Sequence, residues 1–149
     1  MRTGQEVFDV AVHLMDAQNE TTGATDTADT REYRVRAVSL LNSILDRAYP
    51  SSDNYPDPES GKRPVAAKLE TLDDPIDMDD YICLGILPYG LAGLLLTEES
   101  PTMSDFFWQT FLEQLELAKR SMPAKESSVD DTYGFLGDCL EYGQFSRWG

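Results

Sequence analysis

Residues 77–97, DMDDYICLGILPYGLAGLLLT, are the stretch that decides how this chain folds. It opens with three acids within four residues and then carries no charge from Tyr81 to Thr97. A helix that is apolar on nearly every side is buried on nearly every side. The other helical segments of the chain each have one apolar stripe, so we expect them to pack around this one.

Pro88 lies well inside this apolar run. Proline in a helix interior removes the hydrogen bond to the carbonyl four residues earlier and crowds it, so we expect a kink or break near 85–88. Asp77 is the expected N-cap of a helix that starts near Met78. The small residues of the run let neighbouring helices approach closely, and they are Gly85, Gly90, Ala92 and Gly93.

Three further segments have helical periodicity. The first segment is 4–18. Thr3, just before it, and Glu6, in its first turn, match a capping box. Asp29 is the expected cap of a helix that runs to about Ala48, and Ser100-Pro101 is typical of the start of a helix over 102–121. The residues expected in the core are Phe8, Leu41, Ile44, Ile82, Ile86, Pro88, Gly93, Phe107, Phe111 and Leu115.

The remaining parts of the chain have no helical period. Residues 49–64 contain four prolines and are predicted as a long loop. Residues 65–72 are predicted to be extended or irregular, with Val65, Ala67 and Leu69 alternating as in a short edge strand. The fold class is therefore mainly α: a small bundle of four to five helices around a central proline-kinked apolar helix. The bundle domain covers 1–123, with the loop 49–76 inside it, and 124–149 form an extended C-terminal arm.

The C-terminal arm is rich in aromatic side chains, which a disordered tail lacks. We therefore expect it to pack on its own domain or on another molecule, and both alternatives stay open. The residues predicted to make this protein interaction are Tyr133, Phe135, Tyr142, Phe145 and Trp148.

The charge of the chain is strongly negative, with 27 acids against 12 bases and a net charge of −15. Such a surface repels nucleic-acid backbones and anionic membranes. No base lies between Lys68 and Lys119, an interval that holds eleven acids. This negative face serves solubility, repels DNA or meets a basic partner. Arg31, Arg34 and Arg36 form a cluster of positive charge that is either balanced by nearby acids or docks an acidic surface, including that of another copy.

The sequence offers no catalytic, metal or cofactor site, so we expect a protein that is not an enzyme. Asp77 and Asp79 begin like a calcium loop, but Tyr81 and Ile82 stand where that loop needs Asp or Asn and then Gly. The single histidine, His13, falls on a polar helix face, and Cys83 and Cys139 have no metal-ligand spacing. Two free thiols fit a reducing cytosol, with one disulfide as the alternative.

Neither a membrane span nor a leader is expected. The run 81–97 is short for a span, contains Pro88 and is flanked by acids. The first twenty residues include four acids and lack an apolar core of the kind that signal peptides have.

Several pieces of the chain resemble the small virion proteins of tailed bacteriophages and prophages, in particular the head–tail connector (adaptor) group. The pieces are DTADTREYRVRAVSLLNSILDRAYP at 26–50, LDDPIDMDDYICLGILPYGLAGLLLTEE at 72–99, FFWQTFLEQLELAKR at 106–120 and YGQFSRW at 142–148. They cover roughly two-thirds of the chain, and none carries diagnostic chemistry. The loop 49–64 is longer than is usual in compact adaptors of this group.

The resemblance implies a helical subunit that assembles as a ring on the portal and extends the DNA exit channel. Its implied partners are other copies of itself, the portal protein and the tail or stopper protein. DNA would at most pass through an acidic lumen, with no sequence-specific binding. The implied location is the bacterial cytoplasm during assembly and then the head–tail junction of the virion. The alternative is a soluble acidic protein-binding module, such as a DNA mimic that occupies a basic groove.

Overall fold

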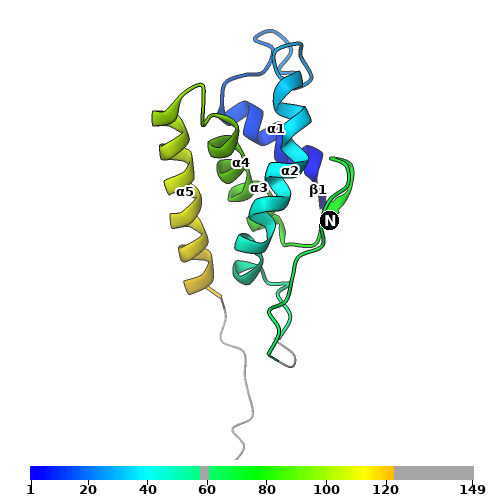
Figure 1. The fold of residues 1–149 in the computed structure, drawn as a ribbon, viewed down its shortest axis with the longest axis vertical. Coiled ribbons are helices and arrows are strands. Elements are labelled where there is room, and N and C mark those ends of the chain that lie inside the picture. Colours follow the sequence, from blue (N-terminus) through cyan, green and yellow to red (C-terminus); the bar gives the residue numbers. More distant parts are fainter. Residues whose placement is uncertain (58–60, 123–149) are drawn as a thin grey trace, which may run out of the picture.

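The computed structural model describes residues 1–57 and 61–122, and this part of the chain is mainly helical, as the sequence predicts (Figure 1). The predicted arm 124–149 and its five aromatic interaction residues lie outside the described residues. The elements in chain order are β1 (Arg2–Thr3), α1 (Gly4–Leu14), α2 (Arg31–Ala48), the 3-10 helix η1 (Tyr49–Ser51), β2 (Pro75–Ile76), α3 (Asp80–Gly85), α4 (Leu87–Leu95) and α5 (Pro101–Arg120).

Helix α4 lies at the centre of the helices and contacts α1, α2, α3 and α5. Along α4 only Tyr89 and Leu94 are partly exposed, and its other side chains are buried. The ten residues that the sequence places in the core are all buried. The uncharged run therefore forms the centre of the described part because its side chains find apolar neighbours on every side.

The expected kinked helix is two helices that meet at Ile86. This residue has φ −124° and ψ −53°, outside helical geometry, and it ends α3 and precedes α4. Pro88 stands in the first turn of α4, where a residue without a backbone N–H leaves no bond unmade. The chain therefore restarts a helix at the proline, which removes the clash that a continuous helix would impose.

The predicted N-cap Asp77 is wrong, and the cap of α3 is Asp79. The Asp79 carboxylate accepts the Ile82 N–H at 3.4 Å. Its other oxygen accepts the Ser52 hydroxyl at 2.8 Å and the Asp53 N–H at 3.1 Å. Asp79 is therefore held by the loop after η1, and this tertiary contact decides where the helix begins.

Two glycines bring α4 and α5 into close contact. A Cβ on Gly93 would lie 3.1 Å from the Trp108 nitrogen and 3.2 Å from the Ser104 oxygen, both backbone atoms. A Cβ on Gly90 would lie 2.9 Å from the Phe111 ring. Gly85 differs from the expectation, because it is exposed and a Cβ there meets nothing within 4 Å.

Helix α1 begins with the predicted capping box, which the structure confirms. The Thr3 hydroxyl accepts the Glu6 N–H at 3.4 Å, and the Glu6 carboxylate accepts the Thr3 N–H at 2.9 Å. The helix ends at Leu14, earlier than expected. The Asp29 cap is wrong: α2 is preceded by Thr30, whose buried hydroxyl donates to the Thr25 carbonyl at 2.6 Å and stabilises the loop.

Residues 65–72 are irregular, as one of the two predicted alternatives, and they lack the alternation of an edge strand. Val65 and Ala67 are exposed, whereas Ala66, Leu69 and Leu72 are buried. In the described part of the chain the strand pairing is β1 with β2, antiparallel, with Arg2 opposite Ile76 and Thr3 opposite Pro75.

Side chains of α2 hold this extended segment. The Asn42 amide donates to the Leu69 carbonyl and accepts the Leu69 N–H, both at 2.8 Å. Asp46 accepts the Ala66 N–H at 3.0 Å and pairs with Lys68 at 2.5 Å. These bonds take the place of the hydrogen bonds that a neighbouring strand would make. Which side chains of the segment are buried therefore depends on its attachment to α2 and not on strand-like alternation.

The α4–α5 contact can be tested with a pair of glycine substitutions. Gly93→Ala should lower the free energy of unfolding by about 1–3 kcal/mol, because its Cβ meets backbone that cannot move independently, and Gly93→Leu should cost more. Gly85→Ala, in open space, should be neutral or stabilising by up to about 1 kcal/mol. Urea denaturation measures both, and equal effects would contradict the close contact at Gly93.

The attachment of residues 65–70 to α2 can be tested at Asn42. Asn42→Ala should cost roughly 1–3 kcal/mol, since it leaves the Leu69 N–H and carbonyl without their partner. It should also speed trypsin cleavage after Lys68, measured by limited proteolysis. Ser39→Ala, an exposed position on the same helix, is the control, and an unchanged cleavage rate in Asn42→Ala would count against the attachment.

Candidate interaction surfaces

The three arginines of the predicted cluster on α2 have different surroundings. Arg34 donates to the Gln5 side-chain oxygen at 2.8 Å, and its guanidinium lies 5.2 Å from the centre of the Phe8 ring. Arg36 lies 3.9 Å from a Glu32 oxygen and 6.0 Å from the Tyr33 ring centre. Arg31 is exposed at the start of α2. Arg34 and Arg36 thus stabilise the fold, and Arg31 is the member best placed to meet another molecule.

Tyr33 joins α2 to the loop between α4 and α5. Tyr33 is buried, and its hydroxyl donates a short hydrogen bond to the Glu99 carboxylate. Burial, together with the hydrogen bond and the negative charge of Glu99, raises the pKa of Tyr33 to about 12. The phenol therefore stays protonated across the physiological range and acts as a donor that fixes this loop.

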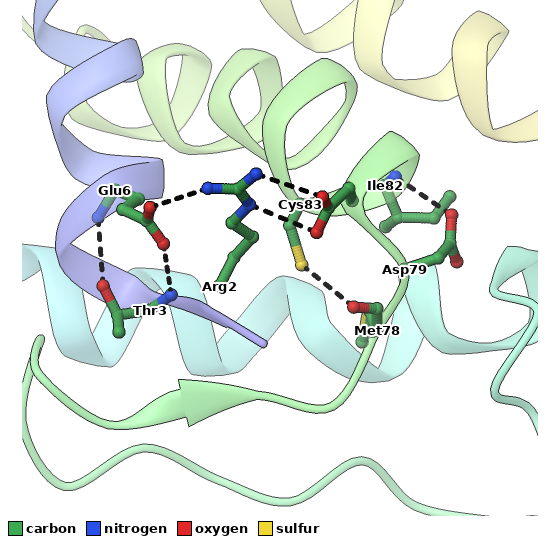
Figure 2. A network of polar contacts seen from close by, with 8 residues as sticks. Arg2, Thr3, Glu6, Met78, Asp79, Ile82 and Cys83 are labelled. Carbon is green, nitrogen blue, oxygen red and sulfur yellow. Dashed lines mark hydrogen bonds and ion pairs between the residues drawn. The ribbon is translucent and has the colours of Figure 1, made fainter.

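The N-terminal residues form a polar network with the start of α3 (Figure 2). Arg2 donates to Glu6 at 3.0 Å and to the two Asp80 oxygens at 3.2 and 3.1 Å. The hydrogen bond from Arg2 lowers the pKa of Asp80, and the Thr3 N–H and then Arg2 lower the pKa of Glu6. The network links β1, α1 and α3, which is a structural role.

Cys83 lies beside this network and is buried and unpaired. Its thiol donates to the Met78 carbonyl at 3.5 Å (Figure 2). Burial raises its pKa to about 12, so the reactive thiolate form is suppressed. Cys139, the other cysteine, lies outside the described residues.

The acids between residues 70 and 116 do not gather on one element. They lie on the segment before α3, on the first residue of α3, on the loop after α4 and on α5. Figure 1 shows α5 and the β1–β2 pair on opposite sides of the domain. Asp74 and Asp79 are half-buried and accept backbone hydrogen bonds. Among the described residues no cluster of His, Cys, Asp or Glu could hold a metal ion.

Helix α5 carries an exposed apolar stripe that the sequence prediction missed. Met103, Phe106 and Leu117 are 43%, 59% and 54% exposed. Phe106 follows Met103 by three residues and Leu117 follows Phe106 by eleven, so the three lie on one face of the helix. This face is beside the core stripe of Phe107, Phe111 and Leu115. The sequence did contain the signal, because a helical wheel of residues 101–120 shows two separate apolar stripes.

A shallow hollow continues this stripe toward the end of α5. It has a volume of about 450 Å³ and is lined by Leu112, Glu113, Glu116, Leu117 and Arg120. Two leucines and three charged side chains thus line it together. A second hollow of about 240 Å³ lies between η1, α3 and the end of α5, with the exposed Tyr81 at its wall. These hollows suit side chains of a protein partner better than a small charged ligand.

No protein-family model matches the chain, and no curated protein or solved structure matches it either. Within the part of the chain that the structure describes, none of the helices combines the length and the apolar content that crossing a membrane requires.

The N-terminal network makes the acid stability of the protein depend on Arg2. Carboxylates with a lowered pKa stabilise the fold above their ordinary pKa, 3.8 for Asp80 and 4.5 for Glu6, and this stabilisation is lost as the pH falls through their lowered values. Arg2→Gln should therefore lose stability less steeply below about pH 4.5. Thermal melts against pH measure this, with Arg31→Gln as the control; equal acid slopes for Arg2→Gln and the unaltered chain would contradict it.

Proposed function

We propose that the protein is a virion structural protein of a tailed bacteriophage or prophage, a head–tail connector (adaptor) subunit. In this proposal copies form a ring on the portal and extend the channel through which DNA leaves. The helices around α4 form the body of the subunit, and the aromatic arm is its anchor. The protein is made in the bacterial cytoplasm and ends at the head–tail junction.

The observation that supports this proposal most is the second apolar stripe on α5. A ring subunit needs a contact surface on each flank. Met103, Phe106 and Leu117 are exposed on a helix at one side of the domain, and exposed apolar groups that gather on one face mark protein contacts. Arg31 offers a contact of opposite sign for an acidic neighbour.

The negative charge fits a channel through which DNA passes without binding. Exposed acids on α5 and on the loop before it repel phosphates and prevent sticking. In this proposal the partners are other copies, the portal protein and the tail or stopper protein. The protein works by binding, with neither catalysis nor a cofactor.

A second candidate is a soluble acidic module that occupies the basic groove of a host protein as a DNA mimic. The net charge of −15 favours it. It requires a stable complex with one basic host protein and absence from virions. Mass spectrometry of purified particles separates the two candidates: presence at a stoichiometric level supports the connector, and absence together with a captured basic partner supports the mimic.

Deleting residues 140–149 tests the arm as the anchor. The truncated protein should fail to enter particles while it keeps the circular dichroism and melting behaviour of the helical domain. Arg31→Glu is a milder companion variant and should reduce incorporation without abolishing it. Normal incorporation of the truncated protein would rule out the arm as the anchor.

A further inference from the structure

The outer face of α5 has a matching segment in the chain itself. Among the described residues, three of the seven large apolar side chains that are exposed lie on this one helix. Glu113 lies between Phe106 and Leu117 on the same face, seven residues after the first and four before the second. Along the helix the face is therefore apolar, then acidic at Glu113, then apolar again, and it ends at the basic Arg120.

The C-terminal residues 142–149, YGQFSRWG, carry the complementary pattern. Arg147 stands between Phe145 and Trp148, and this piece has one base and no acid. It follows a stretch, 123–141, with five acids and one base. Residues 142–149 therefore combine aromatic groups with a positive charge. This combination is complementary to the outer face of α5, which is apolar with an acidic centre.

We propose that residues 142–148 bind in cis to the outer face of α5, with Phe145 and Trp148 on Phe106 and Leu117 and with Arg147 at Glu113. The hollow lined by Leu112, Glu113, Glu116, Leu117 and Arg120 takes one aromatic ring beside its two leucines. The guanidinium of Arg147 then meets the carboxylates of Glu113 and Glu116, and arginine pairs with a carboxylate through two parallel hydrogen bonds. The contact buries apolar groups on both sides, which is its main driving force.

The length of the arm allows this return within one chain. The described residues end at Met122, two residues after α5, so the arm starts beside the lower end of the face. Residues 123–144 reach roughly 70 Å when extended, whereas Met103 and Leu117 are about 21 Å apart along the helix axis. A tether of this length keeps the segment at a millimolar effective concentration, so its own α5 outcompetes that of another copy at ordinary protein concentrations.

Charge disfavours a second copy of α5 as the occupant. Two such helices packed about a twofold axis near residues 113–116 would bring Glu113 and Glu116 of both copies together. Like charges across an interface cost several kcal/mol. The arm carries the opposite charge at the point where it is needed, which favours it as the occupant.

The contact itself does not depend on the proposed function, but its consequence for assembly does. In a connector subunit, the arm would cover the α5 face of the free protein. Transfer of the arm to the portal would uncover that face for the neighbouring subunit. Subunits would then pair on the portal and not in solution, which is a control on ring assembly.

Fluorine NMR of the full chain labelled with 5-fluorotryptophan tests the contact. The chain has two tryptophans, and Trp148→Phe assigns their resonances. Trp148 should resonate away from its position in the urea-unfolded chain. Glu113→Arg and Arg147→Glu should each move it toward that position, and the double variant should move it back. Leu117→Asp should release it as well, whereas Glu98→Arg, an exposed acid outside α5, should leave it in place.

The resonance of Trp108, which packs on Phe111 in the core, reports in every sample that the domain stays folded. The proposal is overturned if Trp148 resonates at the unfolded position in the unaltered chain, or if the double variant gives no recovery. It is also overturned if the Trp148 shift is lost on dilution, since the contact is then between copies. These readouts use the free protein, so they are independent of whether it enters particles.

Discussion

The described part of the protein depends on the burial of α4, and most closely on its contact with α5. Gly93 lies against the backbone of Trp108 and Ser104, and the Ser104 hydroxyl donates to the Gly93 carbonyl at 2.7 Å. Such an approach leaves no room for a side chain on α4. It lets Phe111 fill the space over Gly90 and places Phe107 against the core, so the bulky groups of α5 interlock with the small groups of α4.

Single polar side chains hold the segments that lack helical structure. Asn42 and Asp46 fix the extended segment to α2, while Asp79 joins the loop after η1 to the start of α3. Each satisfies backbone groups that would otherwise remain unpaired near the core. The long connection between α2 and α3 is thus attached at separate points, and the ends of the helices follow from those points of attachment.

Helix α5 has two apolar stripes with different roles. The stripe of Phe107, Phe111 and Leu115 is buried against α4, and that of Met103, Phe106 and Leu117 faces outward beside Glu113. One stripe therefore stabilises the domain, whereas the other is free to contact another surface. The arginines of α2 divide in the same way, because Arg34 and Arg36 serve the fold while Arg31 stays exposed.

The sequence by itself determined the helical class, the buried core, the interruption near Pro88 and the capping box of Thr3 and Glu6, because these follow from local periodicity and short-range hydrogen bonds. Tertiary structure decided the rest. Asp79 and not Asp77 caps α3 because Ser52 and Asp53 bind it, and residues 65–72 follow Asn42 and Asp46 because those side chains replace a strand partner. The sequence predicted the buried stripe of α5, Phe107, Phe111 and Leu115, but not that a second apolar stripe stays exposed. Tertiary structure decided that, because only the stripe that faces Gly90 and Gly93 can reach the core.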